Sequence, residues 1–164
     1  MKLRTAIAAL TLSAGGFVGI LLSEGYSDTA IIPVQGDVPT IGFGTTGGVR
    51  PGDRITPPQA VVRAHRDVVE FEEGLKGCVS VPLYQHEYDA FVSLAYNIGI
   101  GAFCRSTLVR KLNAEDYIGA CLEILRWDKF KGQTLRGLSL RREREYRQCV
   151  GLRADSSPTI LRIA

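Results

Sequence analysis

The 164-residue sequence lacks the residue patterns of the common metal sites. It contains neither a C-x-x-C pair nor a His-rich cluster, and the H-E-Y-D-A stretch at His86 is not the zinc-binding H-E-x-x-H pattern. The other histidine, His65, also stands alone. We therefore expect both histidines to lie at the surface or to cap helices, and the sequence predicts no metal and no other cofactor.

The sequence also lacks an internal repeat and any nucleic-acid recognition motif, so nucleic acid is not an expected partner. Its net charge of +3 is unevenly distributed: residues 24–104 carry 5 Lys/Arg against 10 Asp/Glu, whereas residues 105–164 carry 13 against 7. The basic half indicates either an anionic partner or the solvated face of a helix. Two acids, Glu143 and Glu145, alternate with four arginines there, and both interpretations stay open. These arginines are Arg141, Arg142, Arg144 and Arg147.

No charged residue and no cysteine occurs between Thr5 and Ser23. A helix of these 19 residues would rise roughly 28 Å, about the thickness of the hydrocarbon core of a bilayer. Lys2 and Arg4 precede it and favour an orientation with the N-terminus inside. The run is rich in Ala and Gly, and no A-x-A cleavage site is evident at its end. A cleaved signal peptide, a permanent anchor and a weakly held segment are the three hypotheses.

The rest of the chain is long enough for one domain with a core. Residues 28–52 are rich in Pro, Gly and Thr with short β-branched runs, which predicts a β-hairpin or a three-stranded sheet. A Thr cap followed by Pro opens a long amphipathic helix, with Val61, Val62, Val68, Val69 and Leu75 as its apolar positions. It is expected to run from Thr56 to Gly77, and the remaining helices are predicted at 84–97, 107–113, 114–127 and 138–151.

Glu24 directly follows the apolar run and opens the sequence E-G-Y. Glycosidic bonds are usually cleaved by two carboxyl groups, of which one must hold a proton near neutral pH. An apolar surrounding favours the protonated form, and Leu21 and Leu22 provide apolar neighbours in sequence. The alternative interpretation is that Glu24 only ends a hydrophobic helix.

Four sequence blocks in order carry a resemblance to a known family. They are E-G-Y followed by T-I-G-F-G-T-T, then A-Y-N-I-G-I-G-A-F-C-R-S-T-L-V-R-K-L-N, then G-A-C-L-E-I-L-R-W, and finally L-R-R-E-R-E. Over residues 24 to about 151 the chain resembles the phage lysozyme family of glycoside hydrolases. The resemblance implies an α+β lysozyme-like fold, with a small β-rich N-terminal lobe and a larger helical C-terminal lobe, here preceded by an apolar helix. It also implies cleavage of the bond between N-acetylmuramic acid and N-acetylglucosamine in peptidoglycan.

The resemblance assigns roles to three residues. Glu24 matches the general acid, and Thr40 matches the Thr of T-I-G-x-G that helps to hold the hydrolytic water. The family usually has Asp, or sometimes Cys, six residues before this Thr, where this chain has Val34. We expect Asp37 to replace that acid, although a turn role in G-D-V-P is the alternative. Asp28 is too close to Glu24 to be the usual partner.

Some relatives in this family carry a signal-anchor-release segment, which the run over residues 5–23 resembles. The implied partners are the host Sec machinery for export and the inner membrane for a transient tether, with release to the periplasm. The expected domains are thus an anchor (1–23), a catalytic domain (24–151) and a tail (152–164). Without a cysteine in the anchor, activation by disulfide exchange is not expected.

An exported chain meets an oxidising compartment, where its four cysteines are expected to pair, and four cysteines allow three connectivities. Matching the helical lobe of the family implies the pairs Cys78–Cys104 and Cys121–Cys149. Two other functions stay open from sequence. One is a lytic transglycosylase, which uses a single Glu, and the other is a non-catalytic, membrane-anchored peptidoglycan-binding protein.

Overall fold

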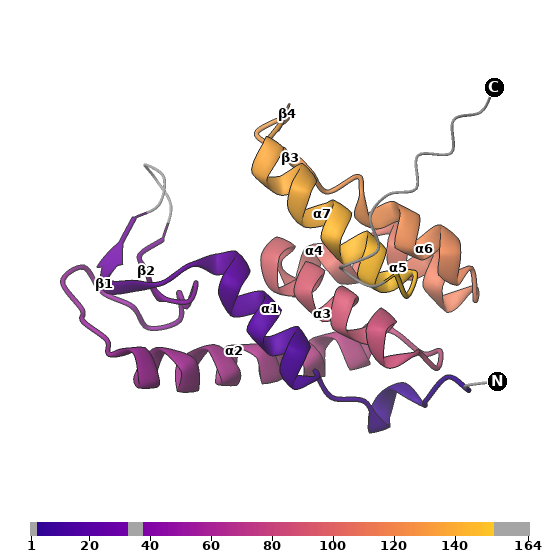
Figure 1. Ribbon diagram of the computed structural model, residues 1–164, viewed down its shortest axis with the longest axis horizontal. Coiled ribbons are helices and arrows are strands. Elements are labelled where there is room, and N and C mark those ends of the chain that lie inside the picture. The colour runs from indigo at the N-terminus through magenta and orange to yellow at the C-terminus, as the bar shows by residue number, and fades with distance from the viewer. Residues whose placement is uncertain (1–2, 33–37, 153–164) are drawn as a thin grey trace.

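The structure is a computed structural model that describes residues 3–32 and 38–152. It has two lobes joined by one long helix (Figure 1). The small lobe holds the antiparallel strands β1 (Ser27–Ile31) and β2 (Thr40–Gly42), which pair from Ser27 opposite Gly42 to Ile31 opposite Thr40 with an irregularity between them. Backbone bonds from residues 53–55 to β1 extend this sheet. The predicted small sheet is thus confirmed.

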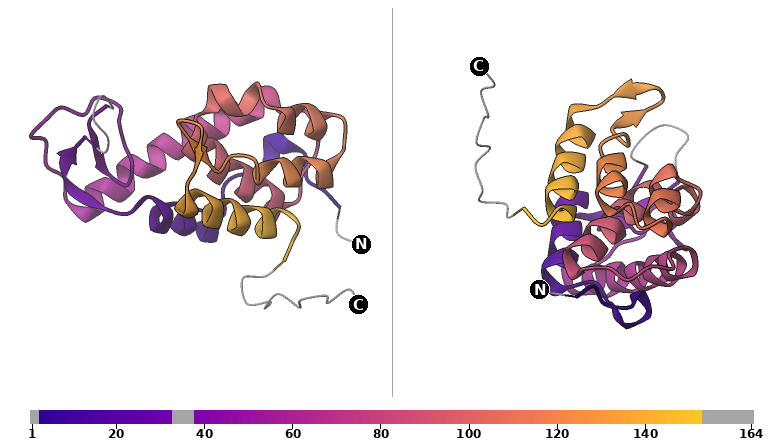
Figure 2. Two further views of the ribbon diagram at one scale, coloured as in Figure 1. Left: turned by 90° about the horizontal axis from the view of Figure 1, so that it is seen from above. Right: turned by 90° about the vertical axis from the view of Figure 1, so that its right-hand side faces the viewer.

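Helix α2 (Pro57–Cys78) connects the lobes, and Figure 2 shows it reaching from the strands into the helical lobe. It starts where predicted, because the Thr56 N–H donates to Gln59 Oε1 at 3.0 Å and Pro57 occupies the first turn. Its buried stripe is Ala60, Ala64, Val68, Glu72 and Leu75.

Three of the valines assigned to the buried face of α2 are exposed instead. Val61, Val62 and Val69 are 37%, 52% and 38% exposed, so that part of the prediction was wrong. The small side chain of Ala60 takes the inward position because β2 packs closely on it: a Cβ at Gly42 would lie 3.0 Å from the Ala60 Cβ. A valine at this contact would not leave room for the strand.

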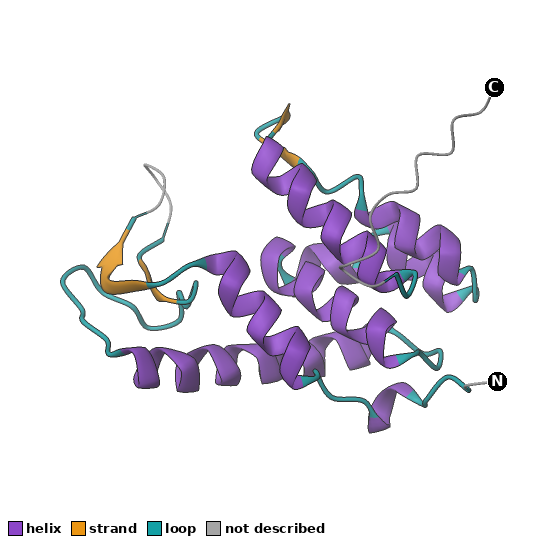
Figure 3. Cartoon of the chain, in the orientation of Figure 1, coloured by secondary structure: helices purple, strands orange, loops and turns teal. Residues whose placement is uncertain are grey.

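The large lobe is almost entirely helical (Figure 3). Helix α3 (Gln85–Ile98) runs through its centre and is surrounded by the other helices, with Tyr88, Phe91 and Leu94 fully buried. These helices are α4 (Ile100–Cys104), α5 (Thr107–Asn113), α6 (Tyr117–Ile124) and α7 (Arg136–Cys149). The sequence predicted α3, α5, α6 and α7 within a few residues, while α4 was not among the predicted helices.

A short hairpin between α6 and α7 was not predicted. It is formed by β3 (Lys129–Phe130) and β4 (Gln133–Thr134). Two disulfides tie the large lobe together: Cys78–Cys104 joins α2 to α4 and Cys121–Cys149 joins α6 to α7, each with a Cα–Cα distance of 5.7 Å. Both pairings implied by the family resemblance are confirmed.

The N-terminal segment differs from the predicted continuous apolar helix. It forms a short 3-10 helix, η1 (Ile7–Ala9), then an extended stretch, and then helix α1 (Ala14–Glu24). No helix among the described residues is both long and apolar enough to cross a membrane. The helix starts only at Ala14 because the Ser13 hydroxyl caps it by accepting from the Gly16 N–H.

Candidate active site

Glu24 is the last residue of α1 and lies where the two lobes meet. Gly25 ends the helix with φ +72°, a conformation that favours glycine, and turns the chain toward β1. The Glu24 side chain is 18% exposed, and its Oε1 accepts from Arg141 Nη1 at 2.7 Å. On the other side, a Cβ at Gly44 would lie 3.2 Å from Glu24 Oε2. The carboxyl is therefore bonded to α7 and lies close to the loop that follows β2.

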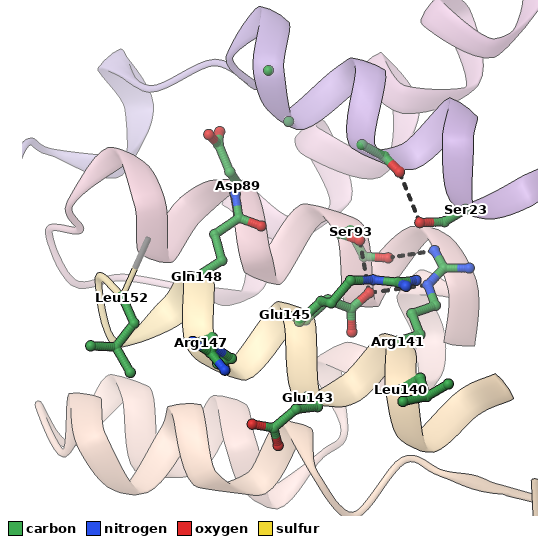
Figure 4. Close-up of a pocket in the computed structure, with 14 residues that line it drawn as sticks. Ser23, Asp89, Ser93, Leu140, Arg141, Glu143, Glu145, Arg147, Gln148 and Leu152 are labelled. Atoms are coloured by element: carbon green, nitrogen blue, oxygen red, sulfur yellow. Dashed lines mark hydrogen bonds and ion pairs between the residues drawn. The ribbon is translucent and has the colours of Figure 1, made fainter. Parts of the chain in front are cut away.

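Arg141 is fixed by a buried network on α7. Its side chain is 8% exposed, and its Nε donates to Glu145 Oε1 at 3.1 Å, an atom that also accepts from Ser93 Oγ at 2.7 Å (Figure 4). Arg142 is fully buried and donates to Asn97 Oδ1 at 2.8 Å. Burial lowers the pKa of the Arg142 guanidinium, and the Glu145 carboxylate 3.0 Å away opposes that shift.

This network corrects the interpretation of the arginine run as a solvated face. Arg141, Arg142 and Glu145 are buried, and only Glu143 and Arg144 are exposed in the first half of that run. The spacing of Arg141 and Glu145, which are four residues apart on one helix, was the signal in the sequence. This pairing was not predicted because alternating charges on a helix usually indicate solvent exposure.

Thr40, the predicted water-holding residue, begins β2 and is half-buried. Its Oγ1 donates to the Val38 carbonyl at 3.2 Å rather than to Glu24. Four residues after Thr40, the chain passes next to Glu24 at Gly44. Strand β2 and the turn that follows it therefore lead from Thr40 to the acid. Asp37 and Val34 lie outside the described residues. Asp28 is exposed on β1 and accepts from the Thr29 hydroxyl at 2.7 Å.

Tyr96 links the lobes beside the acid, which the sequence did not predict. Its hydroxyl, on α3, donates to the Phe43 carbonyl at 3.0 Å, and its ring packs on Phe71 of α2 with centroids 5.1 Å apart. Burial, with the nearby Asp67 carboxylate, raises the pKa of the Tyr96 hydroxyl above its ordinary value. The hydroxyl therefore remains a donor at neutral pH and holds the loop that carries Gly44.

A groove of about 600 Å³ runs between α1 and α7 behind the ion pair. Gly15, Gly16 and Gly19 line one wall, and Arg141 and Glu145 line the other (Figure 4). Ser23, which precedes the acid, also lines this groove. Among residues 3–32 and 38–152, no group of three or more His, Cys, Asp or Glu could hold a metal ion.

The histidines have ordinary structural contacts. The ring of His65 meets Phe17 edge-on with centroids 5.8 Å apart. The ring of His86 stacks on Tyr84, and its Nδ1 lies 3.1 Å from the Cys149 carbonyl oxygen. Neither contact resembles a metal-ligand arrangement.

Known proteins match this chain over most of its length. The Phage lysozyme family model matches residues 22–145. The chain is 42% identical over 110 residues to the endolysin of Acyrthosiphon pisum secondary endosymbiont phage 1, covering 65% of this chain and 75% of that protein. It is 33% identical over 141 residues to the SAR-endolysin of Pseudomonas phage phiKMV, covering 84% and 87%. Among solved structures, the muramidase domain of SpmX from Asticaccaulis excentricus has a TM-score of 0.79 at 30% identity, with 85% and 97% covered.

Proposed function

The chain belongs to the phage lysozyme family and is a muramidase that acts in host cell lysis, and from this premise we propose that Glu24 is its general acid. The observation that supports this role most strongly is the position of the Glu24 carboxyl. It lies at the junction of the lobes, largely shielded from solvent, where it pairs with Arg141 and lies close to the turn at Gly44. The bond proposed to be cleaved is the β-1,4 linkage between N-acetylmuramic acid and N-acetylglucosamine.

In this proposal Glu24 donates its proton to the glycosidic oxygen as the bond from that oxygen to the sugar C1 breaks. The carboxylate that remains pairs with Arg141 at the 2.7 Å distance seen in the structure. Because the Arg141 side chain is itself buried and bound to Glu145, the carboxylate returns to one fixed position. Arg141 thus orients the acid.

As the glycosidic bond breaks, a water molecule attacks C1 from the opposite face of the sugar. We assign Thr40 to position this water and Asp37 to accept its proton, in an inverting reaction. Support comes from the chain path, because Thr40 opens the strand that leads to Gly44 at the acid. Comparing Asp37→Asn with Asp28→Asn tests the assignment. Activity lost in the first variant and kept in the second supports it, and the reverse pattern contradicts it.

The test of the whole assignment is Glu24→Gln, which keeps the shape of the side chain and removes the transferable proton. Lysis of purified cell wall in a zymogram should fall by about 10²- to 10⁴-fold. The thermal melt should change little, since the amide retains one oxygen to accept from Arg141. Retained activity in this variant would exclude Glu24 as the acid.

We further propose that the segment of residues 5–23 tethers the enzyme to the host inner membrane after Sec export and later leaves it for the periplasm. In the structure the segment packs on the large lobe, with Leu10 5% exposed and Ile20 fully buried. Several other apolar side chains stay exposed, including Leu22 at 80% and Val18 at 52%. A segment with this much exposed apolar surface is compatible with both lipid and the protein surface.

Tethering would also explain how the enzyme is kept inactive. Glu24 is the last residue of α1, so the acid reaches Arg141 only when α1 packs on the lobe. Fractionation tests this: full-length protein should appear first with membranes and then in the periplasm after an uncoupler is added. Protein that is always shortened near Ser23 would instead indicate a cleaved signal peptide.

A further inference from the structure

Arg4, which precedes the apolar run, occupies a built site on the large lobe. Its Nη2 donates to Glu87 Oε1 at 2.7 Å and its Nε donates to Glu87 Oε2 at 3.1 Å, so both carboxylate oxygens receive a guanidinium N–H. The Glu87 side chain is 5% exposed. The same Oε2 accepts the Tyr84 backbone N–H at 2.8 Å, which fixes the carboxylate at the start of α3.

Two aromatic rings complete this site. The guanidinium carbon of Arg4 lies 3.5 Å from the centre of the Tyr117 ring and 4.4 Å from that of the Tyr84 ring. Tyr117 is the first residue of α6, so the site spans two helices that are distant in sequence. Cations over aromatic faces at these distances are attracted by the negative potential of the ring.

The neighbouring backbone sets the register of the segment. Thr5 N donates to the Leu83 carbonyl at 2.8 Å, and Leu83 N donates to the Thr5 carbonyl at 2.9 Å. This pair places the Arg4 side chain directly over Glu87 and the two rings. Sequence position alone did not indicate this, since a cation before an apolar run is explained by membrane orientation.

We propose that Glu87, Tyr84 and Tyr117 form a guanidinium-binding site that captures Arg4 when the N-terminal segment leaves the membrane. The proposal rests on the tethering described above. In the tethered form Arg4 would lie on the cytoplasmic side, so Glu87 would lack its cation. Capture restores the pair and fixes the start of the segment whose other end is Glu24. Arg4 thus orients the segment in the membrane and later latches it to the enzyme.

The two roles make different demands on residue 4. Membrane orientation needs only a positive charge, which Lys also provides. The latch needs a planar group that can donate to two oxygens and stack on a ring, which Lys cannot provide. An arginine guanidinium stays charged in both states, and bonding to Glu87 raises the pKa of the Arg4 guanidinium further in the docked state. Arg4→Lys therefore separates the two roles.

The experiment compares full-length wild type, Arg4→Lys and a control. The control is Arg126→Lys, the same change at a pair with Glu123 where the arginine side chain is 73% exposed. We expect all three proteins to reach the membrane fraction equally. Released and purified Arg4→Lys should melt about 3 to 6 °C lower than wild type and should return to added lipid vesicles several-fold more readily. The control should match wild type in both measurements.

Glu87→Gln, which removes the carboxylate and leaves residue 4 unchanged, should reproduce the melting and vesicle results. Combined with Arg4→Lys, its effect should be clearly less than additive. If Arg4→Lys melts and partitions like the control, the latch is excluded, whatever the membrane experiment gives. If wild type never fractionates with membranes while Arg4→Lys still melts lower, the tether is excluded and the site has only a structural role.

Discussion

The helical lobe and the N-terminal segment are held by different kinds of interaction. The lobe has a continuous apolar core and two disulfides. The segment adds only Leu10 and Ile20 to that core and has no disulfide. It has, in addition, polar attachments to buried acids of the lobe: Leu12 N donates to Glu72 at 2.6 Å and the Ser13 hydroxyl donates to Asp89 at 2.6 Å. Arg4 on Glu87 extends the same pattern. An extensive apolar core with disulfides suits a permanent body, whereas a small apolar contact supported by polar attachments suits a part that docks after folding in another environment.

This comparison predicts that damage to the lobe and damage to the segment have different consequences. Replacing Cys121 and Cys149 together by Ala opens a 28-residue connection in the lobe. The expected loss is about 3–4 kcal/mol of unfolding free energy, which chemical denaturation measures. Lysis at 25 °C should stay close to wild type, because neither cysteine contacts Glu24. A large fall in activity without unfolding would contradict the expectation that damage to the lobe affects stability and not catalysis.

Asp89→Ala should affect the segment instead. This buried carboxylate accepts from Ser13 N at 3.0 Å, from Ser13 Oγ at 2.6 Å and from Gln85 Nε2 at 2.8 Å. Removing it should cost about 2–3 kcal/mol of unfolding free energy. It should also lower lysis more than the cysteine variant does, since α1 and Glu24 lose their attachment. Asp89→Asn, which keeps one acceptor, should lie between Asp89→Ala and wild type, and equal activity in all three would contradict the docking role.

Tyr96→Phe should give the smallest change in stability of these variants. It tests the contact between the lobes rather than the lobe core or the N-terminal segment. It removes the hydroxyl that holds the Phe43 carbonyl and leaves the ring on Phe71. We expect kcat for soluble glycan to fall several-fold with KM nearly unchanged, at a cost of about 1 kcal/mol in stability.

Tyr88→Phe is the matched control on the same helix. Its hydroxyl donates to Glu72 at 2.7 Å, and Glu72 keeps its bond from Leu12 N without it, so this variant should lose stability while keeping kcat. A fall in kcat shared by both variants would mean that Tyr96 acts through general stability rather than through the Gly44 turn.

The sequence predicted the lobe better than the segment, for physical reasons. Helix periods and caps are local, so α2 starts at its Thr-Pro signal and α3 lies within one residue of its prediction. The break before Ala14 has a local cap in Ser13, but Leu12 and Ser13 are also bound by Glu72 and Asp89, which lie 60 and 76 residues from them in sequence. No local pattern predicts these two long-range attachments.

The residues of the candidate site were likewise predictable only where the signal in the sequence is local or belongs to the family blocks. Glu24 could be identified from its position after the apolar run and from the family blocks. Arg141 was missed, because its ion pair with Glu24 joins residues 117 positions apart. The role of Asp37 stays a prediction, since it lies outside the described residues.

The central claim is that docking of the N-terminal segment places Glu24 opposite Arg141 and so makes the enzyme active. The most direct test is the specific muramidase activity of one full-length protein, measured on the membrane fraction before release and on the periplasmic fraction after it. We predict that the tethered enzyme is as inactive as Glu24→Gln and that the released enzyme has full activity. Equal specific activity in the two fractions would contradict the claim.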